Sequence, residues 1–184
     1  RRPEPAEPAL GISWLDAVEL ANRASAADGL PLCYAVEVDE AGQVQGVEWA
    51  VDQGGYRLPT EAEWEWMALL ARANGGHDPG DDEPPRRRAG EDGGQGPALT
   101  DLIGIAYQWC WDWYGALPSG PATVDPRGPE HGRKRCIRGG RDGPQAARRR
   151  GSWTPNDRHS TIGLRLVRRP LRAVQGAVAR QEEG

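Results

Sequence analysis

Cysteine and histidine are the residue types in this sequence best suited to redox or metal chemistry. The chain has three of each among its 184 residues: Cys33, Cys110 and Cys136, and His77, His131 and His159. Three widely spaced cysteines match neither a disulfide scaffold nor a zinc site. Each histidine falls in a different expected loop, and none has the helical spacing of a ligand pair. We therefore expect no iron site, and we expect the histidines to be solvated loop residues.

A second group of chemically active side chains lies in residues 141–160, where arginines, amides and one indole gather. The candidate ligand-binding residues there are Arg141, Asp142, Arg148, Trp153, Asn156 and Arg158. Aromatic and arginine side chains dominate binding hot spots, so an exposed Trp153 among them would suit a protein or small-molecule partner. The alternative is that Trp153 fills part of the core while Arg148 and Arg158 pair with acids of the N-terminal region.

The charge of the chain is divided along its length. Residues 1–126 hold 8 basic and 22 acidic residues, whereas residues 127–172 hold 14 basic and 3 acidic residues. A basic region of this kind can be a nucleic-acid surface, but no nucleic-acid motif accompanies the arginines. We therefore expect the two regions to face and neutralise each other in one fold, with no nucleic-acid partner.

Composition excludes several classes of protein. No apolar run approaches the roughly 18 residues of a membrane span, and we expect residues 1–10 to be an extended Pro-rich arm rather than a signal peptide. We therefore expect no membrane partner, and the sparse cysteines favour the cytoplasm. Eight tryptophans, four tyrosines and no phenylalanine indicate a core built largely from indoles.

Local patterns predict two helices. Ser13 and Asp16 can cap a helix that begins at Trp14 and carries an apolar stripe to about Ser25. Thr60 and Glu63 form a capping box for a second helix, which extends to about residue 72. Each cap satisfies backbone N–H groups that the first helical turn leaves free.

Short strands complete the expected fold. Residues 33–38 and 44–51 alternate around a turn at residues 40–42, which indicates a hairpin. Residues 107–114 alternate strictly and place Tyr107 and three indoles on one face, which we expect to lie on the core. Further strands are predicted at 135–138 and 162–167, a mobile Gly/Pro loop at 74–100, and a tail or short helix at 169–184. The predicted class is α+β with short, mostly antiparallel strands and much irregular loop.

Five segments in this order resemble the formylglycine-generating enzyme family, the sulfatase-modifying factors. They are GISWLDA at 11–17, GYRLPTEAEWE at 55–65, WCWDWYG at 109–115, RGG at 138–140 and IGLRL at 162–166. The resemblance covers residues 11–168 and implies a variant of the C-type-lectin fold. Only ten residues precede the first segment, so we expect about the first third of the family domain to be absent.

The resemblance also bears on activity. Family oxidases bind copper and oxidise a substrate cysteine with two cysteines that follow a Gly-Gly-Ser segment, and thiolates select Cu(I). Here Gly139-Gly140 is followed by Arg141, and no cysteine occurs from there to the end. Cys110 and Cys136 precede that place, and we expect both to be small buried apolar residues. We expect no copper and no catalytic residue, and interpret the chain as a non-catalytic lectin-like binding module. The alternatives are an oxidase that converts a protein cysteine to formylglycine, or a degenerate fragment of one.

The resemblance further implies where calcium would bind. Matching positions of the family's calcium loop are Asp101, Gly104, Ala106 and Gln108. Gln108 supplies an oxygen without the usual charge, and Ile105 replaces the usual Asn, so the alternatives are a weak site and a purely structural turn. In the diversity-generating retroelement variable proteins, a branch of this fold, the face corresponding to 141–160 binds ligands.

Overall fold

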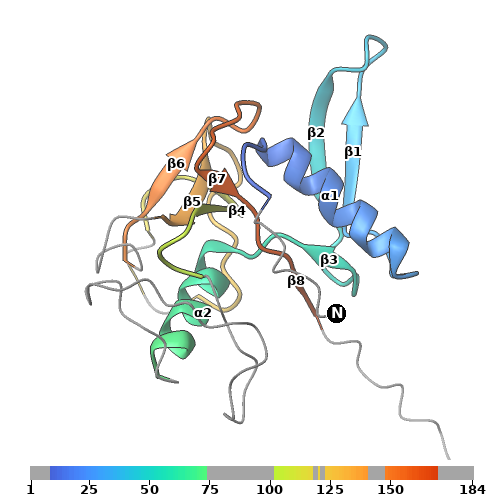
Figure 1. The fold of residues 1–184 in the computed structure, drawn as a ribbon. Helices are drawn as coiled ribbons and strands as arrows, with labels where there is room; N and C mark the ends of the chain where they lie inside the picture. The colour runs from blue at the N-terminus through green and yellow to red at the C-terminus, as the bar shows by residue number, and fades with distance from the viewer. Residues whose placement is uncertain (1–8, 74–101, 118–119, 121–122, 141–147, 170–184) are drawn as a thin grey trace, which may run out of the picture.

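The computed structural model describes residues 9–73, 102–117, 120, 123–140 and 148–169, which form an α+β fold as predicted (Figure 1). Its helices are α1 (Trp14–Ala27) and α2 (Glu61–Ala73). Its strands are β1 (Tyr34–Val38), β2 (Val44–Trp49), β3 (Tyr56–Arg57), β4 (Tyr107–Trp113), β5 (Arg135–Gly139), β6 (Gly151–Trp153), β7 (Ile162–Gly163) and β8 (Val167–Arg168). The predicted loop at 74–100, most of the arm at 1–10 and nearly all of the tail at 169–184 lie outside the described residues.

Helix α1 begins at the predicted cap. The Ser13 hydroxyl accepts the backbone N–H of Asp16 at 3.1 Å, and the Asp16 carboxylate accepts that of Ser13 at 2.7 Å. The helix ends before Gly29, whose φ of 65° suits a residue without a side chain. One face of the helix is buried: Trp14, Ala17, Val18, Ala21 and Ser25.

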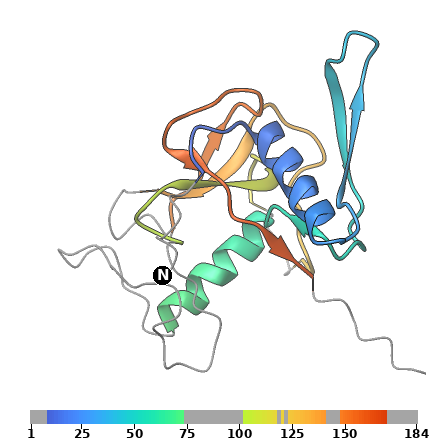
Figure 2. The ribbon, with the colours of Figure 1, turned by 45° about the vertical axis from the view of Figure 1, so that its right-hand side comes forward.

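The β1–β2 hairpin forms a sheet of its own and projects from the body beyond α1 (Figure 2). The Asp39 carboxylate shapes its turn by accepting the N–H groups of Ala41 and Gln43 at 3.0 and 2.8 Å. At the base, the Asn22 amide of α1 donates to the Tyr34 carbonyl at 2.8 Å and accepts its N–H at 3.1 Å. The predicted hairpin is therefore confirmed, and α1 anchors it.

Helix α2 is fixed at its N-terminus by local and distant groups. Thr60 and Glu63 form the predicted capping box, with N–H to side-chain oxygen distances of 3.1 and 2.9 Å. The Arg57 guanidinium donates to both Glu63 oxygens at 2.6 Å. Asp112 of β4 accepts the Glu61 N–H at 2.7 Å. The helix is thereby tied to the central sheet.

The central sheet has the order β6-β5-β4-β7, antiparallel except for the parallel pair β4–β7. The prediction of a single strand at 162–167 is wrong. Its start forms β7 beside β4, whereas its end enters β8, which pairs with β3 in another sheet. Strands β3 and β6 were not predicted, because two or three residues cannot display an alternating period.

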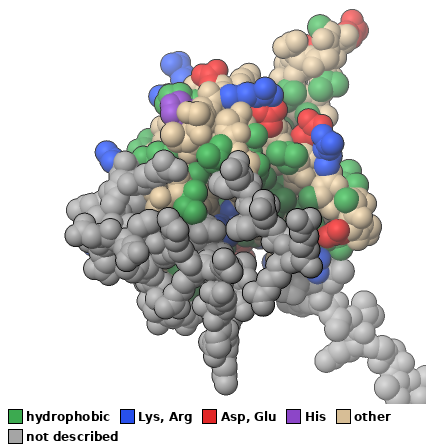
Figure 3. Space-filling view, viewed as in Figure 1, with side chains coloured by type: hydrophobic (Ala, Val, Ile, Leu, Met, Phe, Trp, Pro, Cys, Tyr) green, Lys and Arg blue, Asp and Glu red, His purple; other side chains and the backbone are tan. Residues whose placement is uncertain are grey.

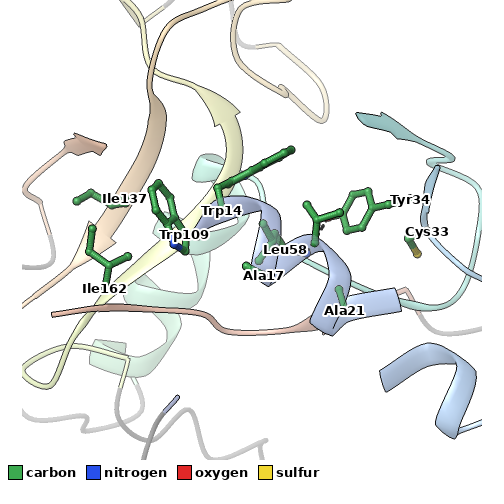
Figure 4. Close-up of a cluster of buried hydrophobic side chains, with 10 residues drawn as sticks. Trp14, Ala17, Ala21, Cys33, Tyr34, Leu58, Trp109, Ile137 and Ile162 are labelled. Atoms are coloured by element: carbon green, nitrogen blue, oxygen red, sulfur yellow. Dashed lines mark hydrogen bonds between the residues drawn. The ribbon is translucent and has the colours of Figure 1, made fainter. Parts of the chain in front are cut away.

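Strand β4 is covered on both sides. Its indole-bearing face packs with α1 in one hydrophobic cluster (Figure 4): Trp14, Ala17, Val18, Ala21, Cys33, Tyr34, Leu58, Trp109, Ile137 and Ile162. Its other face packs with α2 in a second cluster: Trp64, Ala68, Leu102, Cys110 and Cys136. The alternation located the first cluster, but the burial of the second face depends on where α2 docks. Neither helix of the described chain is long and apolar enough to cross a membrane.

Candidate functional site

The predicted binding face includes Trp153, the last residue of β6. This indole is half-buried, packs against the α1 cluster and meets the His159 ring edge-on at a centroid distance of 5.0 Å. The indole nitrogen is buried without a hydrogen-bond partner in the described part of the chain. Trp153 therefore combines both interpretations of its role, with one side against the core and the other beside an exposed ring.

The other predicted ligand-binding residues lie in different surroundings. Arg158 donates to both Asp16 oxygens at 2.9 and 2.8 Å, so it holds the loop after β6 to α1, as the alternative interpretation expected. Asn156 and Arg148 are exposed. Arg141 and Asp142 lie outside the described residues. The structure thus places Asn156 and Arg158 in the loop that follows Trp153 at the end of β6.

His159, which the sequence predicted only as a solvated loop residue, also belongs to this face. It is exposed beside Trp153, and its Nδ1 lies 2.9 Å from the Thr161 hydroxyl. His159 lies six positions after Trp153, in residues that belong to no helix or strand, so no periodic pattern pairs the two rings. Only the turn between β6 and β7 brings the two rings together.

A buried ion cluster under α2 was also missed. The Glu61 carboxylate accepts Arg138 Nη1 at 2.9 Å and Arg150 Nη2 at 2.7 Å, and the Cys136 thiol donates to it at 3.2 Å. Burial alone would raise the pKa of Glu61, but the two guanidinium groups outweigh burial and lower it. The cluster stabilises an ionised glutamate and fixes the position where Arg150 enters β6.

All three cysteines of the chain are fully buried free thiols. Cys110 and Cys136 lie on the paired strands β4 and β5 within the α2 cluster, so the structure does bring these two into one cluster. Burial raises the pKa of both thiols, and the Glu61 carboxylate raises that of Cys136 further. Copper requires thiolates, and protonated thiols sealed under α2 do not fit that ion.

Groups in the predicted calcium loop form hydrogen bonds with other parts of the protein. Asp101 lies outside the described residues. The Gly104 N–H donates to the Gly140 carbonyl at 3.0 Å, and the Ala106 carbonyl accepts the Gly140 N–H at 3.0 Å. The Gln108 side-chain oxygen is buried and accepts two hydrogen bonds, one of them from Arg165. In the described residues, no group of three or more His, Cys, Asp or Glu side chains could hold a metal ion.

Charges of both signs mix on the described surface seen in Figure 3. C-terminal arginines pair with acids of the N-terminal region: Arg138 and Arg150 with Glu61, Arg158 with Asp16, and Arg169 with Asp52. For these residues, the charge division of the sequence is neutralised within the fold, as expected.

Comparisons with known proteins agree with this architecture. The sequence profile of the sulfatase-modifying factor enzyme 1-like domain matches residues 1–88 and 95–170. The formylglycine-generating enzyme of Thermomonospora curvata is 31% identical over 165 residues, covering 74% of this chain and 45% of that protein. That of Bos taurus is 29% identical over 161 residues, covering 74% and 35%.

A solved structure extends the similarity to the fold. Treponema denticola variable protein 1 matches with a TM-score of 0.66 and 27% identity, over 89% of this chain and 71% of that one. The chain spans less than half the length of the two formylglycine-generating enzymes. With the profile covering nearly the whole sequence and the α+β architecture shared, the chain belongs to the sulfatase-modifying factor enzyme 1-like family.

Proposed function

We propose that this chain is a non-catalytic binding module that keeps the frame of the formylglycine-generating enzymes without their copper chemistry. One observation carries the proposal: all three cysteines are buried thiols, and none follows Gly139-Gly140 in the sequence. Cysteine oxidation of the family type needs an accessible thiolate pair. Raised thiol pKa values in Cys110 and Cys136 oppose thiolate formation.

The binding face we propose lies on the loop between β6 and β7. Trp153 and His159 offer an aromatic edge there, and the exposed Asn156 offers an amide beside it. Aromatic rings contribute large contact areas at little cost in conformational entropy, and amides contribute directional hydrogen bonds. Similarity to a variable protein supports this choice, because the variable-protein branch is expected to bind ligands on this face. The occupant would be a protein or a small molecule.

The alternative function, oxidation of a protein cysteine to formylglycine, is tested directly. The purified chain is incubated with copper, oxygen and a sulfatase peptide that contains the target cysteine, and aldehyde is measured by mass spectrometry. The Thermomonospora curvata enzyme serves as the positive control. We expect no aldehyde from this chain, and measurable turnover would overturn the proposal.

The binding face is tested with immobilised panels of glycans and peptides. Any panel member that retains the native chain is tested again with Trp153→Ala and Asn156→Ala variants. We expect Trp153→Ala to lose at least about tenfold in affinity, the range of an aromatic hot spot. Near-ultraviolet circular dichroism verifies that both variants keep the native fold. Binding that survives both substitutions would place the ligand elsewhere.

A further inference from the structure

Hydrogen bonds close the loop that leads into β4. They occupy both lone pairs of the Gln108 side-chain oxygen, so this oxygen has none left for a metal ion. The Gln108 side-chain oxygen accepts the Trp64 indole N–H at 3.0 Å and the Arg165 Nε–H at 3.1 Å. Its side-chain nitrogen donates to the Leu102 carbonyl at 2.9 Å. An amide oxygen has two lone pairs, so both are used by these two donors.

These three partners join separate parts of the fold. Trp64 comes from α2 and is fully buried, Leu102 opens the loop, and Arg165 lies between β7 and β8. Gln108 itself is only 5% exposed. A buried amide with satisfied groups has a fixed orientation, since turning it would leave buried polar atoms without partners.

Charge favours the guanidinium over a metal ion at this point. Calcium gains affinity from negatively charged oxygen ligands, and Gln108 contributes none. The Arg165 guanidinium is already a permanent cation 3.1 Å from the oxygen that would have to coordinate calcium. A second cation beside it would be repelled in a buried site where screening by water is weak.

Gly139 and Gly140 close the other side of the loop. A Cβ at Gly140 would lie 2.6 Å from the Tyr107 ring, and one at Gly139 would lie 2.9 Å from the Ala106 carbonyl oxygen. Both glycines have positive φ, at 85° and 98°. The Ala106 carbonyl is therefore held against backbone and accepts the Gly140 N–H.

We infer that Gln108 and its hydrogen-bond partners close this loop without a metal ion, so that the fold is independent of calcium. The Arg165 guanidinium supplies a positive charge, and the Gln108 amide supplies a neutral acceptor matched to it. The inference is separate from the proposed binding function and does not depend on it.

The native chain provides the first test. Tb³⁺, a calcium analogue whose emission is excited by a nearby indole, is titrated into the purified chain with Trp64 as the donor beside the loop. We expect no saturable emission that calcium displaces, and a melting temperature that differs by less than about 1 °C between millimolar calcium and EGTA. Displaceable Tb³⁺ binding that is lost in Gln108→Ala would overturn the inference.

A pair of substitutions provides the second test. Gln108→Glu combined with Arg165→Met restores a carboxylate and removes the guanidinium, and we expect calcium to raise the melting temperature of this double variant by about 5 °C or more. Gln108→Glu alone should stay independent of calcium, because the new carboxylate would pair with Arg165. A folded double variant that ignores calcium would contradict the assignment.

The single variant Arg165→Met provides a third test, which can be used even if the double variant does not fold. We expect a melting temperature lower by several degrees than that of the matched control Arg133→Met, which removes an exposed arginine. Equal melting temperatures for the two single variants would show that Arg165 does not support the loop.

Discussion

Asp112 is a buried carboxylate whose charge opposes folding. It is 3% exposed on β4, and its oxygen accepts the Glu61 N–H at the start of α2. Burial raises the pKa of Asp112 from its ordinary 3.8 to about 6. The folded state therefore binds this proton more tightly than the unfolded chain, so the stabilising effect of protonation is complete at low pH and is lost as the pH rises through about 6.

Asp112→Asn should remove this pH dependence. Two units of pKa correspond to about 3 kcal/mol, which is the largest loss that Asp112 can cause between pH 4 and pH 7. The amide keeps an oxygen for the Glu61 N–H but does not titrate. Urea unfolding at pH 4 and pH 7 measures both proteins, and we expect a smaller difference between the two pH values for the variant. An unchanged difference would mean that other groups cause it.

Trp64 is the side chain through which α2 contacts the sheet. It is fully buried, and Trp66 on the same helix is 62% exposed, which provides an internal control. We expect Trp64→Ala to lower the free energy of unfolding by about 3–5 kcal/mol, because it opens a large cavity and leaves Gln108 with one donor fewer. Trp66→Ala should change it by about 0.5 kcal/mol or less. Chemical denaturation measures the free energy of unfolding of both variants. Similar decreases in the two variants would contradict the burial of Trp64.

At the scale of elements, the ion pair between Asp16 and Arg158 joins α1 to the loop after β6. The hydrogen bond from Arg158 lowers the pKa of Asp16 to about 2. The Asp16 carboxylate therefore stabilises the folded state above about pH 4, and this contribution is lost as the pH falls through about 2.

Arg158→Gln should weaken that junction while the α1 capping box stays in place, because Ser13 and Asp16 still bond to each other. We expect faster amide hydrogen exchange across residues 154–161 and a smaller loss of stability between pH 4 and pH 2. Arg23→Gln removes the exposed pair with Glu19 and serves as the control. Equal exchange in the two variants would show that the pair does not hold the loop.

The elements themselves were largely predictable. Both helix caps and both helices depend on residues three or four apart, the hairpin depends on alternate residues around a short turn, and each was confirmed within about two residues. Strands β7 and β8 were predicted as one because their residues continue the same apolar pattern. The division arises because β4 and β3, which pair with them, lie in different sheets.

At the scale of the whole molecule, ion pairs among the described residues join the basic and the acidic regions of the sequence. Arg138 and Arg150 lie beside Glu61, although 77 and 89 residues separate them from it. These two guanidinium groups already pair with a carboxylate of the protein and are not available to bind phosphate. Fluorescence anisotropy with labelled single-stranded and duplex DNA should therefore show no saturable binding at micromolar protein and physiological salt. Binding that weakens steeply with salt would indicate a nucleic-acid surface instead.

The candidate site was predictable only in part. Trp153, Asn156 and Arg158 could be selected because their types suit binding and they stand close in sequence. The contacts of His159 and Glu61 could not be predicted, because they depend on partners that the fold supplies. Nothing in the local sequence says that Glu61 meets two arginines or that His159 turns toward an indole.

The sequence by itself determined the family, the caps, the hairpin and the lack of a cysteine after Gly139-Gly140, since each is read from residue types at short spacing. Tertiary structure alone decided that both faces of β4 are buried, that Cys110 and Cys136 are sealed under α2, and that Arg165 reaches Gln108 from 57 residues away. The physical reason is the range of the interactions. Caps and turns are local, whereas burial and ion pairing depend on which distant segments pack together.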